Sequence, residues 1–139
     1  MGQEATNLSL IKSAYSRWNT DKEQNFQHWM SLVAENVRWR SLAAGARGME
    51  FTGTCDCKDD VLNYFKGLAQ DWEMVHYTPV HYVAQDDWVV MRGTCGWRHR
   101  HTKKVVETPK ADFLRLQDGK VVEFHEFFDT AAALEAARA

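Results

Sequence analysis

The sequence has 139 residues, of which 45% are hydrophobic and 26% are charged, and its formal net charge is -2. This length predicts one domain, residues 1–139, that can bury a core of its own. The near-neutral charge gives no reason to expect nucleic acid as a partner, and no apolar run approaches the roughly 20 residues of a membrane span. Without a visible signal peptide or nucleotide-binding motif, we expect a cytoplasmic protein that has no cofactor and no membrane partner.

Helical periodicity dominates the first half of the chain. Three stretches carry apolar residues at helical spacing and predict helices: residues 8–18, 26–33 and 59–68. Residues 34–42 read as a short strand, and residues 43–56 form a loop that contains several glycines. The third helix is expected to begin near Asp59, because acidic residues favour the positive end of a helix.

The second half consists of long β-rich runs separated by short polar breaks. The runs cover residues 72–84, 88–100, 103–116 and 120–128. Breaks of this length are typical of hairpins, so the sheet is expected to be mostly antiparallel. Pro79 and Pro109 lie inside these runs and indicate strand edges or bulges. Asp129 or Thr130 can cap a short C-terminal helix that extends through Leu134.

Helices followed by a curved antiparallel sheet predict an α+β fold. Three helices from the N-terminal half would pack on one face of the sheet and make a cone-shaped barrel, with a short C-terminal helix. The open end of such a cone is a natural site for a hydrophobic small molecule.

Two carboxylates lie on apolar strand faces near the end of the chain. Asp112 shares a face with Leu114, and Glu126 shares a face with Phe124 and Phe128, because side chains alternate along a strand. A carboxylate in such a position must be paired, protonated or involved in chemistry. These residues are therefore the first candidates for a functional site.

The tight turn between the last two strands leaves two registers open. A two-residue turn sets Asp112 opposite His125. A three-residue turn sets Asp112 opposite Phe124 and Lys110 opposite Glu126, and it places both carboxylates on one face. On a shared face the two carboxylates should not both ionise easily, because their like charges would lie close together. The alternative for either carboxylate is a structural pairing with Lys110.

The order of elements and the closing segment ADFLRLQDGKVVEFHEFFDTAAALEA resemble the SnoaL-like superfamily, and GMEFTGTCDCKDDVLNYFKGL resembles its loop into the third helix. That superfamily shares the cone fold of nuclear transport factor and ketosteroid isomerase. The resemblance implies an apolar pocket and a homodimer formed through the sheet. The superfamily includes isomerases, cyclases, hydrolases, dehydratases and non-catalytic binding modules, so the fold does not decide the function.

The resemblance also suggests roles for individual residues. In ketosteroid isomerases a tyrosine and a protonated aspartate form an oxyanion hole, and Tyr15 and Asp112 fall at similar places. The isomerase base lies at the end of the first strand, where this chain has Ser41. Glu126 resembles the second aspartate of limonene-epoxide hydrolases, whose Arg-x-Asp pair is missing here. Asp112 also resembles the acid/base aspartate of SnoaL-type polyketide cyclases.

Our hypothesis from the sequence is an enzyme that performs acid/base chemistry next to a carbonyl, by cyclisation or isomerisation. Asp112 would be the acid/base or enolate stabiliser, Tyr15 a second donor, and Glu126 a base or a group that orients water. The residues expected to contact the substrate are Trp18, Trp39, Ser41, Trp72, Leu114, Phe124 and Phe128. The alternative is a binding module without chemistry, which Ser41 in place of the isomerase base favours.

Two further expectations concern assembly and metals. If the even-numbered residues of the last strands line the pocket, then Phe113, Val121 and Phe127 face outward, and a two-fold dimer through the sheet would cover them. His99 and His101, together with the cysteines near residue 56, fit no standard zinc spacing, so no metal is expected.

Overall fold

The computed structural model describes residues 2–139, and its elements follow the predicted order. They are α1 (Gln3–Asp21), α2 (Gln27–Leu32), β1 (Val33–Ser41), a 3₁₀ turn (Glu50–Thr52), α3 (Lys58–Asp71), β2 (Trp72–Gln85), β3 (Trp88–His99), β4 (Val105–Gln117), β5 (Lys120–Phe128) and α4 (Thr130–Ala137). The first helix is longer at both ends than expected. Val33, expected in the second helix, instead begins β1.

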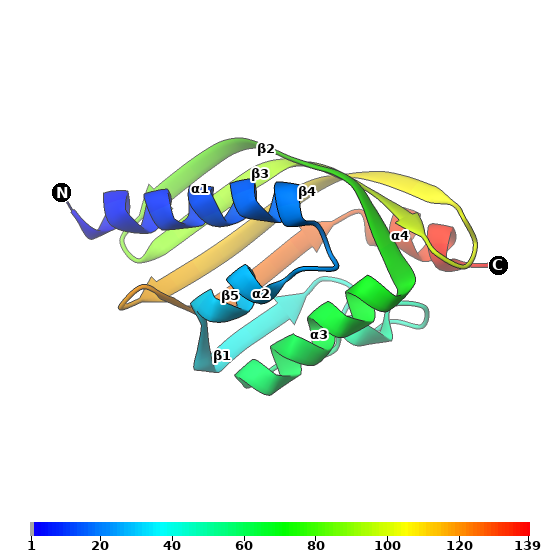
Figure 1. The fold of residues 1–139 in the computed structure, drawn as a ribbon, viewed down its shortest axis with the longest axis horizontal. Helices are drawn as coiled ribbons and strands as arrows, with labels where there is room; N and C mark the ends of the chain where they lie inside the picture. The colour runs from blue at the N-terminus through cyan, green and yellow to red at the C-terminus, as the bar shows by residue number, and fades with distance from the viewer. Residues whose placement is uncertain (1) are drawn as a thin grey trace.

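The strands form one curved five-stranded sheet in the order β1-β5-β4-β3-β2 (Figure 1). Only β1 and β5 pair in parallel; the other neighbours are antiparallel. The helices α1, α2 and α3 lie on one face of the sheet, and α4 lies beside the hairpin end of β3 and β4. This arrangement confirms the predicted α+β cone, with the difference that the sheet is not closed into a barrel.

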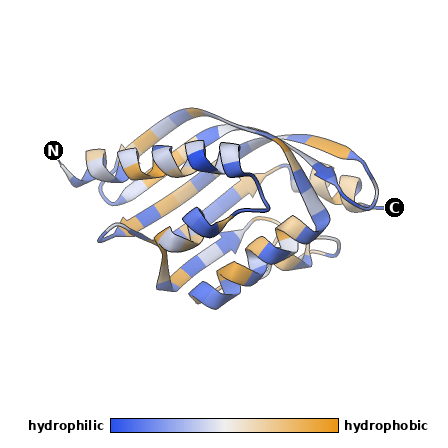
Figure 2. Ribbon diagram, viewed as in Figure 1, coloured by the Kyte–Doolittle hydropathy of each residue, from blue (hydrophilic) through white to orange (hydrophobic). Residues whose placement is uncertain are grey.

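Amphipathic patterning explains how the helices attach to the sheet (Figure 2). The buried residues Ile11, Tyr15 and Trp18 of α1 recur at helical spacing and face β2 and β3. In α3 the buried stripe includes Val61 and Leu68. None of the helices among residues 2–139 has the length and apolar character needed to cross a membrane.

The β4–β5 turn resolves the register that the sequence left open. It has two residues at positive φ, Asp118 at 51° and Gly119 at 77°, a conformation that suits a tight hairpin. A bulge at Val122 then shifts the pairing and places Asp112 directly opposite Glu126. The two-residue turn is therefore confirmed, since Gln117 lies opposite Lys120, but the bulge makes both expected partners of Asp112 wrong. The two carboxylates do share one face, as the three-residue turn predicted.

The same bulge corrects one expectation about the outer face of the sheet, which we call the convex face. Val121 is fully buried, because the extra residue at Val122 turns its side chain toward the core. Phe113 and Phe127 do lie on the convex face, and these residues are 38% and 41% exposed.

The strand prolines lie where a missing N–H is tolerated. Pro79 is in the edge strand β2 beside a register shift, as predicted. Pro109 lies in β4 just past the last β5 pair, Lys110 with Phe128. A second irregularity in β2 changes the alternation of side chains, so that Tyr77 is buried on the same side as Met74.

Gly93 gives a test of the close contact between β2 and β3. A Cβ atom at this position would lie 2.2 Å from the Thr78 carbonyl oxygen, next to the Pro79 bulge. We expect Gly93→Ala to lower the free energy of unfolding by about 1–3 kcal/mol, because the backbone must move apart. Urea denaturation measures this, and Gly2→Ala is the control, since nothing lies within 4 Å of its Cβ. Equal midpoints for both variants would contradict the packing described here.

Candidate functional site

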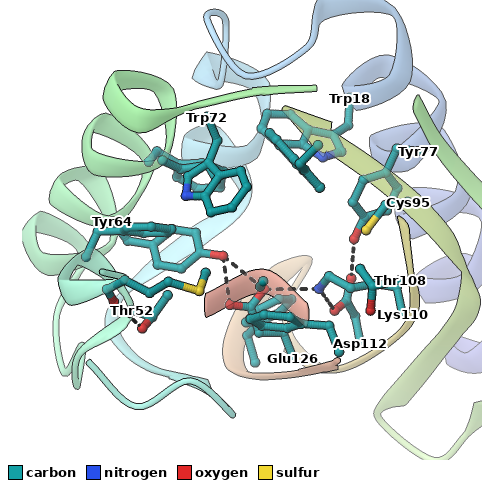
Figure 3. Close-up of a pocket in the computed structure, with 18 of the residues that line it drawn as sticks. Trp18, Thr52, Tyr64, Trp72, Tyr77, Cys95, Thr108, Lys110, Asp112 and Glu126 are labelled. Atoms are coloured by element: carbon teal, nitrogen blue, oxygen red, sulfur yellow. Dashed lines mark hydrogen bonds and ion pairs between the residues drawn. The ribbon is translucent and has the colours of Figure 1, made fainter. Parts of the chain in front are cut away.

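Six polar side chains from five elements meet on the helix-covered face of the sheet, and Figure 3 labels all of them except Tyr15. This polar cluster consists of Tyr15 (α1), Tyr64 (α3), Tyr77 (β2), Lys110 and Asp112 (β4), and Glu126 (β5). All six are buried, and the most exposed, Lys110, is only 8% accessible. Buried polar groups at this density must satisfy one another or a ligand.

The Lys110 ammonium bridges the two carboxylates. Its Nζ donates to Asp112 Oδ1 and to Glu126 Oε1, the latter over 3.0 Å. Lys110 can do this because it lies two residues before Asp112, on the same strand face. Burial lowers the pKa of the Lys110 ammonium, but Asp112 and Glu126 outweigh burial, and the net effect is a pKa above its ordinary value. The pairing with Lys110 that the sequence left as an alternative is therefore present.

Three tyrosines complete the polar cluster. Tyr15 Oη and Tyr77 Oη both donate to Asp112 Oδ2, over 2.6 Å and 2.8 Å. Tyr64 Oη lies 2.9 Å from each oxygen of Glu126. Burial, followed by the adjacent carboxylate, raises the pKa of all three phenols well above the ordinary value. Their O–H groups are thus held as donors to the carboxylates.

The two carboxylates differ in how many further hydrogen bonds they can accept. Asp112 is 1% exposed and accepts hydrogen bonds from Lys110, Tyr15 and Tyr77. Glu126 is 5% exposed and accepts from Lys110 and from the single hydrogen of Tyr64. Since a carboxylate offers about four acceptor positions, Glu126 keeps more capacity for a ligand.

A cavity of about 80 Å³ lies against the polar cluster. Most of its lining is aromatic: Trp18, Trp29, Trp39, Trp72, Trp97, Phe51, Phe65, Phe124 and Phe128, with the three cluster tyrosines. Figure 3 shows Trp18 and Trp72 on one side of the space and Lys110 and Glu126 on the other. Pockets for drug-sized ligands measure roughly 300–1,000 Å³, so the rings must move apart for a large ligand.

The cavity includes most of the residues expected from the sequence. Its lining contains Tyr15, Trp18, Trp39, Trp72, Asp112, Phe124, Glu126 and Phe128. Leu114 and Ser41 are outside it, contrary to expectation. Leu114 is fully buried in the core, and the Ser41 hydroxyl accepts a hydrogen bond from the Ala43 N–H in the loop after β1.

Sequence reasoning overlooked two tyrosines and undervalued one lysine. Tyr64 could have been found, because it lies three residues after Val61 on the buried stripe of α3. Tyr77 could not, because its inward orientation depends on a bulge in β2. Lys110 was placed on the correct face but treated only as a pairing residue.

Metal and thiol chemistry find little support at this site. Within residues 2–139, no three His, Cys, Asp or Glu side chains are grouped so as to hold a metal ion. Cys95 lines the cavity, but burial raises the pKa of its thiol to about 11, against an opposing effect of Lys110. A thiol with this pKa is protonated at neutral pH and is a weak nucleophile.

The tyrosines give a prediction for alkaline pH. The chain has four, and burial raises the pKa of the fourth, Tyr82, to about 12. Tyrosines of the unfolded chain ionise near pH 10. The stabilisation that comes from keeping these phenols neutral is therefore complete below pH 10 and lost as the pH rises further.

We expect absorbance titration of the folded protein to show no tyrosinate near pH 10. Ionisation should instead coincide with loss of the circular dichroism signal at higher pH. Tyr82→Phe is the control and should leave this coincidence unchanged, because Tyr82 lies outside the polar cluster. A phenol that titrates near pH 10 in the folded Tyr82→Phe variant would contradict the hydrogen bonds of Tyr15, Tyr64 and Tyr77, since only these three tyrosines remain in it.

Comparison with known proteins places the chain in a family. Residues 11–124 match the model of the SnoaL-like domain. No functionally curated protein matches the sequence.

Solved structures with the same fold have low sequence identity to the chain. An NTF2-like protein from Burkholderia thailandensis E264 is 22% identical, with a TM-score of 0.80 over 96% of this chain and 98% of that one. TerC, co-crystallised with polyporic acid, is 18% identical, with a TM-score of 0.77 over 96% and 98%. A protein with a ketosteroid isomerase-like fold from Catenulispora acidiphila DSM 44928, in complex with trimethylamine, is 13% identical, with a TM-score of 0.72 over 89% and 91%. The fold and the family match together identify the chain as a member of the SnoaL-like domain family.

Proposed function

We propose that the protein catalyses acid/base chemistry next to the carbonyl of a hydrophobic small molecule, by cyclisation or isomerisation. The observation that carries the proposal is the buried group of Lys110, Asp112 and Glu126 against an aromatic cavity. Burying charges is costly, and perturbed ionisable groups in a cleft are concentrated at functional sites. The aromatic lining favours a hydrophobic ligand over a polar one.

We assign the proton transfer to Glu126 and a positioning role to Asp112. Glu126 has the greater unused acceptor capacity, and it lines the cavity. Asp112 is occupied by three donors, so its role is to hold Lys110, Tyr15 and Tyr77 in place. Tyr15, whose only O–H donates to Asp112, acts through that carboxylate.

The ligands of two relatives support a small-molecule site. Polyporic acid was co-crystallised with TerC, and trimethylamine is bound by the Catenulispora protein. Both are small organic molecules, which supports a small-molecule ligand here, although a ligand as large as polyporic acid requires the aromatic rings that line the cavity of about 80 Å³ to move apart. At such low identity they do not indicate which molecule this chain binds.

A non-catalytic binding module is the second candidate. Every side chain of the polar cluster has at least one partner within it, so none is left unpaired when no ligand is bound. Ser41, at the position of the isomerase base, is consistent with this alternative. In that case the cluster would only anchor a polar group of the ligand.

Hydrogen exchange tests the reaction without knowledge of the substrate. The protein is incubated in D₂O with a panel of small hydrophobic ketones, and deuterium at the α-carbon is measured by NMR. We expect catalysed exchange in at least one ketone, and Glu126→Gln should slow it by about a hundredfold or more. Glu123→Gln is the matched control, because Glu123 lies on the same strand and pairs with His125 away from the cavity. Binding of ketones without any exchange would favour the binding module.

We also propose a two-fold dimer through the convex face. Val83, Val90 and Phe113 are neighbours across three strands, and Phe127 packs edge-on against Phe113 with ring centroids 5.6 Å apart. Val83 is 61% exposed, and such a patch on a sheet is unfavourable in water. A second copy would cover it.

Light scattering at micromolar concentration tests this assembly. We expect the mass of a dimer for the wild-type protein and of a monomer for the double variant Phe113→Asp, Phe127→Asp, because charges would be buried in the interface. Leu42→Asp is the control, since Leu42 is 53% exposed but lies after the end of β1. A monomeric wild-type protein would exclude the dimer at this concentration.

A further inference from the structure

Lys110 has hydrogen-bonding capacity that the polar cluster does not use. An ammonium group carries three N–H donors, and the Lys110 ammonium bonds to two acceptors, Asp112 and Glu126. Lys110 also lines the cavity. The three tyrosine O–H groups of the cluster, in contrast, all donate to carboxylates. The third N–H of Lys110 is thus the strong donor that the cluster leaves for a ligand.

We propose that Lys110 is a further catalytic residue, whose ammonium binds the substrate's carbonyl oxygen and stabilises the enolate that forms when Glu126 removes the neighbouring proton. This inference rests on the proposed function and names the group that stabilises the enolate in that reaction. It differs from the isomerase resemblance, which would give this role to Tyr15 and a protonated Asp112.

The surroundings of Lys110 suit this role. Its Nζ lies 6.0 Å from the ring centroid of Tyr77, 5.9 Å from that of Phe124 and 5.8 Å from that of Phe128. A charge interacts strongly with a developing oxyanion in such a water-poor site. Because Asp112 and Glu126 hold the Lys110 pKa above its ordinary value, the amine stays protonated. It therefore acts through its charge, since a nucleophilic lysine must be neutral.

The proton transfer keeps the charge around Lys110 balanced. The substrate C–H bond breaks, its proton goes to the Glu126 carboxylate, and its electron pair forms the enolate with negative charge on oxygen. Before this step Lys110 lies between two carboxylates, and afterwards between Asp112 and the enolate. The total charge remains -1 throughout, from one ammonium and two negative groups. Return of the proton to another carbon completes an isomerisation.

This charge balance defines the class of substrate. With both carboxylates ionised, the polar cluster already carries one excess negative charge. A ligand that enters as an anion would add a second buried negative charge, which is unfavourable. The substrate is therefore an enolisable carbonyl compound that binds uncharged and becomes negative only in the site.

A phenol can serve as an enolate analogue in the test. We choose 4-nitrophenol, which has a single ring and whose absorbance distinguishes the neutral from the ionised form. Glu126→Gln makes the cluster neutral and leaves Lys110 with one carboxylate partner. The matched variant Lys110→Met, Asp112→Asn, Glu126→Gln has the same cluster charge but no ammonium. We expect the ionisation constant of the bound probe to be at least about tenfold larger in Glu126→Gln than in the triple variant.

Folding of each variant is checked by thermal melting and near-ultraviolet circular dichroism. If the triple variant does not fold, Lys110→Gln, Asp112→Asn, Glu126→Gln repeats the comparison at the same cluster charge, because it keeps a polar side chain at position 110 and an acceptor oxygen for the two tyrosines at position 112. Equal ionisation of the probe with and without Lys110 overturns the inference. If ketone exchange persists in that case, the proposed function stands without Lys110. Lys110-dependent ionisation without ketone exchange supports the oxygen-binding role and overturns the proposed reaction.

Discussion

The contact of one ammonium with two carboxylates is the interaction on which the arrangement of this site depends. The β4–β5 register sets Asp112 directly opposite Glu126 on a buried face. Two like charges there would repel each other strongly, since little water screens them. Lys110 lies on the same face and contacts both. The register is therefore tolerable because of a residue two positions away on β4.

The polar cluster also connects the helices to the sheet. Tyr15 links α1 to β4, and Tyr64 links α3 to β5. Tyr77 links the edge strand β2 to the central strand β4. A fully apolar face would hold these elements as well, because buried ion pairs can often be replaced by apolar side chains without loss of stability. The presence of the charges is thus better explained by chemistry or binding than by stability.

The periodicity of the sequence predicted the helices and strands and the apolar faces of the strands. Bulges in the strands determined which side chains pair across the sheet. The spacing of Asp112 and Glu126 among apolar residues placed each on an apolar strand face, but whether the two faces were the same depended on the turn between the strands. Their pairing was not predictable, because the bulge at Val122 depends on packing and has no sequence signal. The same holds for Tyr77, which strict alternation from Met74 would turn outward. Local propensity fixes which side chains alternate, and tertiary packing fixes where the alternation is interrupted.

The aromatic walls of the cavity contribute two unpaired hydrogen-bond donors as well as shape. The Trp39 and Trp72 indole N–H groups have no hydrogen-bond partner among the described residues. Both rings lie edge to face with neighbours, Trp39 with Tyr64 and Trp72 with His99 at a centroid distance of 4.9 Å. These ring contacts do not satisfy the two N–H groups, and both residues line the cavity, so each N–H remains a donor for an acceptor on a ligand. The orientation of a bound molecule can therefore be set by an indole N–H together with the charged donor and acceptor of Lys110 and Glu126, which lie across the space from Trp72 (Figure 3).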